Sequence, residues 1–195
     1  MRIVAGEFKG RSLAPVPRHG VRPTADPVRE ALFNILGPGV RDEAFVDIAA
    51  GTGAVGLEAY SRGARPVVMV ERDRHAADTI RRNLERLGLD PRGADGLVLA
   101  FAEAGQWLRG AARDLLPPRV GTFFLDPPYG EPRLARWIEA IAHGGWLDDE
   151  SLVIVEHRTG DPVAWGPLSA RWTRRYGDSS LSAGGLPEPL ADEQK

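Results

Sequence analysis

From residue 44 to residue 156, short apolar runs alternate with longer amphipathic stretches. The apolar runs are four to six residues long, which suits buried strands. The stretches between them repeat apolar side chains at every third or fourth position, which is typical of helices. This alternation indicates βαβ units and predicts an α/β fold with a mostly parallel sheet. We expect strands at 44–49, 66–70, 97–101, 122–125 and 152–156, and helices at about 54–62, 73–87, 104–116 and 131–143.

The N-terminal part follows a different pattern. Apolar segments at 2–5 and 11–14 flank Gly6 and Gly10, which predicts a small β-hairpin. A linker rich in proline, glycine and arginine runs from 15 to 23, and Thr24 then fits the N-cap of a helix. The apolar residues of this helix are Val28, Leu32, Ile35 and Leu36.

The C-terminal part predicts an antiparallel ending. Segments 171–176 and 180–183 flank a Gly-Asp turn, which indicates a hairpin that closes the sheet. We therefore divide the chain into an N-terminal hairpin with its basic linker (1–23), one α/β domain (24–185) and a disordered tail (186–195).

The composition narrows the chemistry. With 195 residues, 43% of them hydrophobic, the chain is long enough for one core. The absence of cysteine excludes disulfides, thiolate metal sites and a thiol nucleophile. The four histidines have no ligand spacing, so we expect no metal. Because no long apolar run or signal-peptide pattern occurs, we expect a cytoplasmic protein with no membrane association. We also expect a monomer.

The charge is unevenly distributed. A net charge of −2 gives no general attraction to nucleic acid. Residues 1–29, however, contain six basic side chains against two acidic ones, a local balance of +4. This basic arm is either a solvated segment or a contact to phosphate groups. Its basic residues are Arg2, Lys9, Arg11, Arg18, Arg22 and Arg29.

A glycine-rich loop follows the first predicted strand. Gly51, Gly53 and Gly56 allow a tight turn before a helix, and Glu71 ends the next strand, where a ribose-binding carboxylate belongs. The same pattern serves nicotinamide enzymes and methyltransferases. Asp47 favours S-adenosylmethionine, because a carboxylate repels a pyrophosphate but tolerates a sulfonium and an amino group.

The predicted cofactor site continues along the strand ends. Glu71 suits two ribose hydroxyls, and Glu103 after the third strand suits the adenine amine, with the backbone of Ala102 beside it. A helix-entry role for Glu103 is nearly as good an interpretation. The full set of predicted cofactor residues is Asp47, Ala49, Gly51, Thr52, Gly53, Glu71, Arg72, Ala102 and Glu103.

The sequence Asp126-Pro127-Pro128-Tyr129 follows the fourth predicted strand. Two prolines fix an extended backbone without N–H donors, so the turn presents acceptors only. Asp126 and the Pro127 carbonyl can hold the N–H groups of an exocyclic base amine during methyl transfer. Tyr129 can stack on a base taken out of its helix. We predict that these four residues are catalytic.

Further segments extend these motifs across nearly the whole chain. They are the opening at 2–13, the Arg-Pro-Thr segment at 22–36, and the segments 58–64, 156–157 and 176–178. Together with the glycine loop and the Asp-Pro-Pro-Tyr turn, they resemble the RsmD family of small-subunit ribosomal RNA guanine-N2 methyltransferases. The sequence departs from that family's pattern at Ala49, Thr52 and Glu103, where the family usually has Phe, Ser and Asp.

This resemblance implies a Rossmann-like class I methyltransferase fold: a mostly parallel seven-stranded sheet with a reversed final strand, plus an N-terminal β-hairpin. It implies S-adenosylmethionine as cofactor and the N2 amine of a specific guanine, guanine 966, in 16S rRNA as acceptor. The small ribosomal subunit or its assembly intermediates would be the partner. Candidate RNA-binding residues are Arg2, Lys9, Arg11, Arg22, Thr24 and Arg29.

Three alternatives stay open at this point. An adenine-N6 DNA methyltransferase would use the same Asp-Pro-Pro-Tyr turn, although the chain has no room for a target-recognition domain. A nicotinamide-dependent dehydrogenase would use the glycine loop and Glu71. A non-enzymatic RNA-binding protein would not need Asp126.

Overall fold

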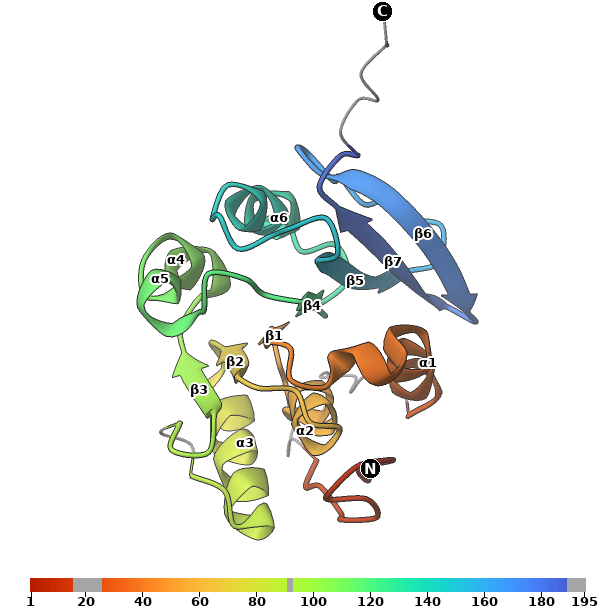
Figure 1. Ribbon diagram of the computed structural model, residues 1–195. Helices are drawn as coiled ribbons and strands as arrows, with labels where there is room; N and C mark the ends of the chain where they lie inside the picture. The colour runs from red at the N-terminus through yellow and green to blue at the C-terminus, as the bar shows by residue number, and fades with distance from the viewer. Residues whose placement is uncertain (16–25, 91–92, 189–195) are drawn as a thin grey trace, which may run out of the picture.

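Seven strands form one sheet in the computed structural model, which describes residues 1–15, 26–90 and 93–188. The strands are β1 (Phe45–Ile48), β2 (Val67–Glu71), β3 (Leu97–Phe101), β4 (Thr122–Leu125), β5 (Leu152–Arg158), β6 (Ser169–Tyr176) and β7 (Ser179–Gly185). Their order across the sheet is β3-β2-β1-β4-β5-β7-β6. In Figure 1 the view runs nearly along β1, β2 and β4, so the sheet crosses the picture from β3 to β6.

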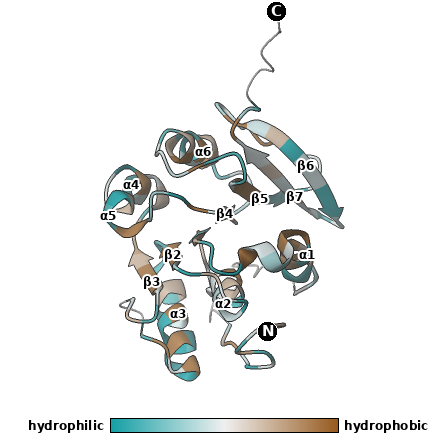
Figure 2. Cartoon of the chain, viewed as in Figure 1, coloured by the Kyte–Doolittle hydropathy of each residue, from teal (hydrophilic) through white to brown (hydrophobic). Residues whose placement is uncertain are grey.

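Helices cover both faces of this sheet (Figure 1). One face carries α1 (Asp26–Leu36), α2 (Ala54–Ser61) and α3 (Arg74–Leu87), and a short 3-10 helix, Gly37–Val40, continues α1. The other face carries α4 (Ala104–Arg109), α5 (Ala112–Leu115) and α6 (Leu134–Ala142). Each layer encloses its own hydrophobic core. Figure 2 shows α3 with hydrophobic and hydrophilic residues along its length, as expected for a helix that packs on one side only.

The predicted strands and most predicted helices are confirmed. The helix expected at 104–116 is instead two helices, because Gly110 adopts a non-helical backbone (φ −129°, ψ −101°) between α4 and α5. The helix expected from 131 begins only at Leu134, because residues up to Arg133 form the turn that follows the Asp-Pro-Pro-Tyr segment. Strand β5 is longer than expected because it continues to Arg158 beside β7.

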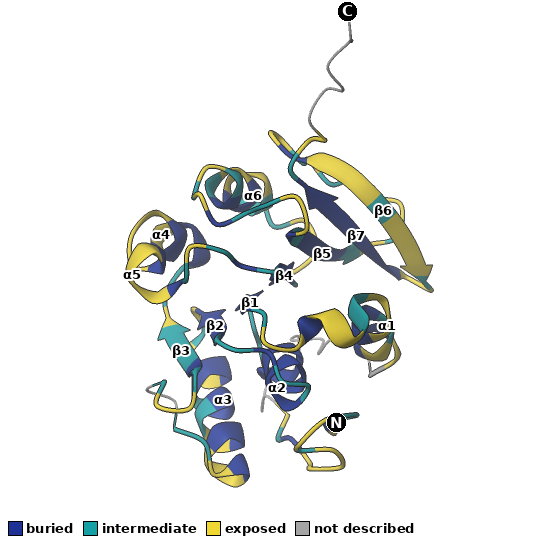
Figure 3. Cartoon of the chain, viewed as in Figure 1, coloured by how far each residue is buried: buried dark blue, intermediate teal, exposed yellow. Residues whose placement is uncertain are grey.

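The last strand is reversed, as predicted. β7 lies between β5 and β6 and is antiparallel to both. It is buried throughout despite its serines (Figure 3), because their hydroxyls have partners: Ser182 contacts His157 and Thr173 at 2.8 and 2.7 Å. Gly184 must lack a side chain, since a Cβ there would lie 2.4 Å from Trp165. The outer strand β6 is mostly exposed and carries arginines, which discourage pairing with another sheet edge.

The N-terminal segment is held by the end of α2. It pairs with itself through a single bridge, Arg2 to Ser12, so the predicted hairpin is confirmed only as a minimal one. Ser61 donates its hydroxyl to the Ala5 carbonyl at 2.6 Å and accepts the Phe8 amide at 2.9 Å. Gly6 has φ +82° and passes so close to Ser61 that a Cβ would lie 1.8 Å from its carbonyl oxygen.

Glu58 is the buried anchor of this contact. Its two carboxylate oxygens accept the backbone amides of Val4 and Ala5 at 2.7 and 3.0 Å. Arg62 donates to the same carboxylate at 2.8 Å, and the Nε atom of Arg29 lies 3.9 Å away. Arg29 is 0% exposed and donates to the Arg2 carbonyl at 2.6 Å. The buried Glu58 and Arg29, with their hydrogen bonds to backbone groups, therefore hold the N-terminal segment and α1 against α2.

Several predicted features fall wholly or partly in segments that the structure does not describe. The Thr24 cap, Arg22 and most of the linker fall in 16–25, and most of the predicted tail falls in 189–195. The first residues after β7 make contacts: Arg171 donates to the Leu186 carbonyl and to the Glu188 carboxylate, both at 2.9 Å.

Replacing Glu58 is expected to destabilise the fold. Glu58→Gln should lower the free energy of unfolding by about 3 kcal/mol, because it removes the charge that faces the buried Arg29 guanidinium. Urea unfolding measures this value, with Glu85→Gln on the exposed side of α3 as the control. Equal stability of the two variants would contradict the role of Glu58.

Candidate active site

A cavity of about 420 Å³ opens at the carboxyl ends of the central strands. Ligands bind at this edge in open α/β sheets. The cavity brings together the glycine loop, the end of β2, the start of α4 and the Asp-Pro-Pro-Tyr turn. The predicted residues that line it are Ala49, Gly51, Glu71, Arg72, Ala102, Asp126, Pro127, Pro128 and Tyr129.

The glycine loop has the backbone that its sequence predicts. Gly51 and Gly53 have φ values of +57° and +75°, in the left-handed region that favours glycine. Ala49 also has a positive φ, +62°, which is a strained conformation for a residue with a Cβ. The Gly51 amide donates to the Glu71 carboxylate at 2.8 Å. The loop is therefore tied to the end of β2 by its own backbone.

Asp47 precedes the glycine loop on β1 and is not among the residues that line the cavity. It is 1% exposed, and its Oδ2 accepts the amide of Gly56 at 2.8 Å, which holds the first turn of α2 against β1. Burial raises the pKa of Asp47 to about 7; the Gly56 hydrogen bond opposes this rise and the Glu71 carboxyl adds to it. Gly56 has no room for a side chain, since a Cβ would lie 2.6 Å from Met69.

Glu71 lines the cavity and is 7% exposed. One of its oxygens accepts the Gly51 amide and the other accepts the Asp73 amide at 2.7 Å. A carboxylate has about four acceptor positions, so both oxygens retain capacity for ligand hydroxyls. The predicted ribose role thus fits the geometry. Ala102, on the neighbouring strand end, donates its amide to the Glu71 carbonyl at 3.0 Å.

Thr52 and Gly53 belong to the glycine loop but are not among the residues that line the cavity. The Thr52 carbonyl accepts the side-chain amide of Asn83 at 3.0 Å, and Asn83 Oδ1 accepts the Ala14 amide at 2.7 Å. Asn83 is 0% exposed and so joins α3, the glycine loop and the N-terminal segment. Sequence reasoning missed this role; the available signal was an asparagine on the apolar side of a predicted helix, next to Leu84.

An ion-pair network borders the cavity near α4 and α6. The side chain of Arg133 makes two hydrogen bonds to Glu131, at 2.6 and 2.8 Å, which hold the pKa of Glu131 below its ordinary value. Arg72 lies 3.7 Å from the same carboxylate. Glu103 caps α4 by accepting the Gln106 amide at 2.8 Å and lies 3.4 Å from Arg133.

Glu103 thus takes the helix-entry role that was its alternative interpretation. It is not among the cavity-lining residues. Partial burial acts to raise its pKa, but the amides of Gln106 and Gly105 and the charge of Arg133 outweigh it and lower the pKa.

The Asp-Pro-Pro-Tyr turn leaves β4 with its tyrosine held in place. Asp126 donates its amide to the Ile48 carbonyl at 3.2 Å, which joins the turn to β1. The Tyr129 hydroxyl lies 2.8 Å from the Ser179 hydroxyl, at the start of β7. The Arg158 guanidinium stands 5.5 Å from the centre of the Tyr129 ring. The ring is nevertheless 37% exposed, so it is oriented but accessible.

A second cavity, of about 240 Å³, lies on the other side of this turn. It extends from the turn to the end of β5 and the loop at 158–164. The two cavities share Pro127, Pro128, Tyr129, Glu131 and Glu156. The turn is therefore the wall between two neighbouring spaces.

The predicted RNA-binding residues divide into two groups. Arg2, Lys9 and Arg11 are exposed on the N-terminal segment, and Arg11 also donates to the Arg86 carbonyl at 2.6 Å. Arg29 is a correction: it is fully buried against Glu58, so it cannot reach a phosphate. Its place in a basic segment suggested a surface residue, whereas the helix turns it inward.

Within the described residues, no group of three or more His, Asp or Glu side chains is arranged to hold a metal ion. Nor does that part of the chain contain a helix long and apolar enough to cross a membrane.

The buried Asp47 should make stability depend on pH. Between about pH 4 and pH 7 the folded chain keeps a proton on Asp47 that the unfolded chain has lost. The stability that Asp47 contributes is full below this window and is lost as the pH rises through about 7. Relative to Asp47→Asn, the wild type should therefore lose up to about 1.4 kcal/mol per pH unit across it.

Urea unfolding of both proteins between pH 4.5 and pH 8 measures this difference. Asp149→Asn, an exposed substitution, is the matched control and should show no such trend. A pH-independent difference between wild type and Asp47→Asn would contradict the assignment.

Comparisons with known proteins agree with this geometry. The chain is 36% identical over 174 residues to the Ribosomal RNA small subunit methyltransferase D of Escherichia coli K12, covering 89% of this chain and 81% of that protein. A hypothetical protein of Thermus thermophilus superimposes with a TM-score of 0.78 at 28% identity, over 95% of this chain and 99% of that one.

An RNA methyltransferase from Salinibacter ruber, solved in complex with S-adenosyl-L-homocysteine, shares the fold with a TM-score of 0.62 at 16% identity, over 88% of this chain and 98% of that one. The family model described as Conserved hypothetical protein 95 matches residues 1–184. The chain therefore belongs to this family, which is the RsmD family that its motifs resemble.

Proposed function

We propose that this protein transfers a methyl group from S-adenosylmethionine to the N2 amine of a guanine in 16S rRNA, by family resemblance guanine 966. The observation that carries the proposal is the position of the Asp-Pro-Pro-Tyr turn. It separates a cavity framed by the glycine loop and Glu71 from a second cavity beyond Tyr129. A donor on one side and a base on the other would meet at Asp126 and Pro127.

The charge of the larger cavity fits a cationic cofactor. Five of its lining side chains are acidic and one, Arg72, is basic. Such a lining attracts a sulfonium and an amino group, and it repels the pyrophosphate of a nicotinamide dinucleotide. The volume of about 420 Å³ is within the range of small-molecule sites. The acidic lining residues are Glu71, Asp73, Asp126, Glu131 and Glu156.

The residues of this chain divide the work of binding between them. Glu71 would hold the ribose hydroxyls, while Ala49 and Gly51 let the backbone approach the ligand. The bound cofactor supplies an electrophilic methyl group on a positively charged sulfur. Asp126 and the Pro127 carbonyl would accept the two amine N–H groups and orient the nitrogen lone pair toward that methyl group.

Methyl transfer to the amine also requires an acceptor for one proton. As the amine nitrogen forms its new bond to carbon, it must release a proton, and the Asp126 carboxylate is the acceptor at hand. Stacking on Tyr129 would hold the base plane during this step, a contact worth roughly 1–3 kcal/mol per base.

The small ribosomal subunit or an assembly intermediate is the proposed partner. The support is the family membership, the name of the Escherichia coli relative and the exposed Arg2, Lys9 and Arg11. These side chains would contact phosphates and so position the particle without reading its sequence. Arg22 and Thr24, the other candidates, lie outside the described residues. We also propose that the protein acts as a monomer in the cytoplasm, without a metal.

The activity is testable on purified components. The protein, labelled S-adenosylmethionine and small subunits from a strain lacking the gene should yield labelled N2-methylguanosine at one position, detected by nucleoside mass spectrometry. Asp126→Asn should reduce transfer at least 100-fold while S-adenosylhomocysteine still raises the melting temperature. Label in duplex DNA adenine, or stabilisation by NAD but not by S-adenosylhomocysteine, would refute the proposal.

Tyr129 and Ser179 should affect catalysis jointly, through the hydrogen bond between their hydroxyls. Tyr129→Phe and Ser179→Ala are each expected to lower kcat/KM about fivefold, because either change removes the same bond of about 1 kcal/mol. The double variant should be no worse than either single one. Ser169→Ala on exposed β6 is the control. Fully additive losses would show that the two hydroxyls act separately.

A further inference from the structure

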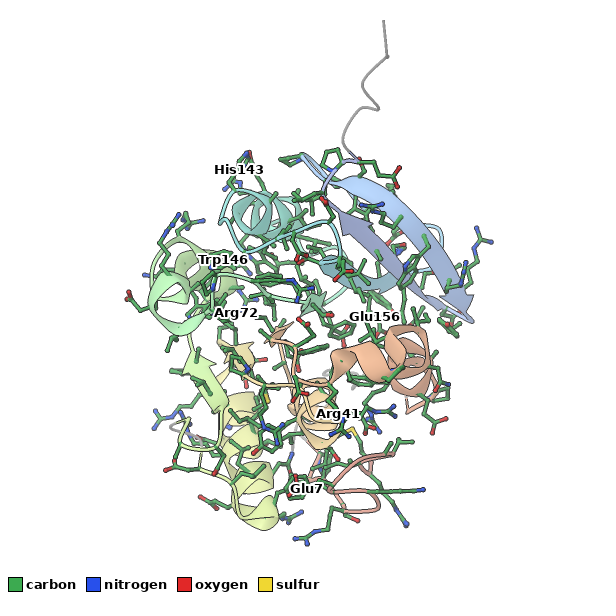
Figure 4. All side chains as sticks on the ribbon, in the orientation of Figure 1. Glu7, Arg41, Arg72, His143, Trp146 and Glu156 are labelled. Carbon is green, nitrogen blue, oxygen red and sulfur yellow. The ribbon has the colours of Figure 1, made fainter. Side chains whose placement is uncertain are left out.

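Two carboxylates lie next to each other where β4 ends: Asp126 follows β4 directly, and Glu156 lies within β5, two residues before its end at Arg158. Leu125 and Val155 are paired in the parallel register of β4 and β5, so Asp126 and Glu156, one residue further along, are adjacent at the carboxyl edge. Both line the larger cavity. Figure 4 shows Arg72 and Glu156 on opposite sides of β1 and β4, with Glu156 on the β5 side.

Glu156 is built into the site. It is 6% exposed and it lines both cavities, so it lies beside the place where a base beyond Tyr129 would meet the donor. A carboxylate oxygen that accepts an N–H group in a site sheltered from water forms a strong, charge-assisted hydrogen bond.

We infer that Glu156 is the residue that selects guanine, by accepting the N1–H of the base while Asp126 accepts an N–H of the N2 amine. The inference rests on the proposed function and adds a basis for its substrate preference. The Asp-Pro-Pro-Tyr turn offers acceptors to any exocyclic amine, so it does not distinguish guanine from adenine. A second acceptor on the next strand does.

The reason is the order of donors and acceptors on the bases. Guanine is the only standard RNA base that presents an amine next to a ring N–H. In adenine and cytosine the ring nitrogen beside the amine is an acceptor, which a carboxylate oxygen repels. Uracil has no amine. Two neighbouring carboxylates therefore match guanine, and a site that hydrogen-bonds a substrate group discriminates strongly against analogues that lack it.

The test uses the base analogue 2-aminopurine, which keeps the 2-amino group but has an acceptor at N1. Small-subunit particles are assembled with guanosine, 2-aminopurine riboside or inosine at the target position, and kcat/KM is measured for each. Wild-type protein should prefer guanosine over 2-aminopurine by on the order of 100-fold or more. Inosine, which has no amine, should not be methylated.

The variant Glu156→Gln should change this preference. A glutamine amide can accept from guanine N1–H or donate to the N1 of 2-aminopurine. The ratio of the two kcat/KM values should therefore fall at least tenfold. The matched control, Glu139→Gln on the exposed side of α6, should leave the ratio unchanged. Melting temperatures with and without S-adenosylhomocysteine verify that each variant folds and binds the cofactor.

The outcomes separate the two claims. Equal wild-type rates on guanosine and 2-aminopurine would overturn the role of Glu156 without any variant. A parallel loss on both substrates in Glu156→Gln, with the ratio unchanged, would show a merely structural role. Methylation of inosine, or no transfer to guanosine at all, would instead refute the proposed function.

Discussion

Every helix that begins at the carboxyl edge of a strand exposes backbone N–H groups, and these must be satisfied where the protein is buried. This chain satisfies many of them with carboxylates. Asp47 accepts the Gly56 amide, Glu71 accepts two amides of the loop and of the approach to α3, and Glu103 caps α4. Glu58 does the same for the N-terminal segment. The bonds of Glu71 to the glycine loop and to the approach to α3 shape the larger cavity.

Some features of the site can be predicted from local sequence patterns, and the hydrogen bonds of its acids cannot. Strand positions, the glycine loop and the Asp-Pro-Pro-Tyr turn follow from local patterns of apolar residues, glycines and prolines, which act over a few residues. The hydrogen bonds of Asp47 and Glu103 to backbone amides do not follow from local patterns, because an acid beside a loop looks the same whether it binds a ligand or a backbone amide. Only the direction of the side chain separates the two, and tertiary packing decides it.

Other residues escaped because their partners are far apart in sequence. Asn83 bonds to Ala14 and to the glycine loop, Arg29 faces Glu58, and Ser179 positions Tyr129 across fifty residues. None of these pairs has a local signature. Asn83 on the apolar side of α3 was a sign of this kind, whereas Arg29 and Ser179 stand in polar stretches of the sequence. The structure thus adds the long-range polar contacts, while the sequence specifies the elements that they join.

The reversed strand β7 connects this framework to the chemistry. By inserting between β5 and β6, it extends β5 to Arg158 and brings Ser179 beside the Tyr129 hydroxyl. The same pairing places Glu156 opposite Leu181 in the interior of the sheet. A strand that merely followed β5 in parallel would bring neither contact. The topology that closes the sheet therefore also fixes the tyrosine and the acid at the wall where base and methyl donor would meet.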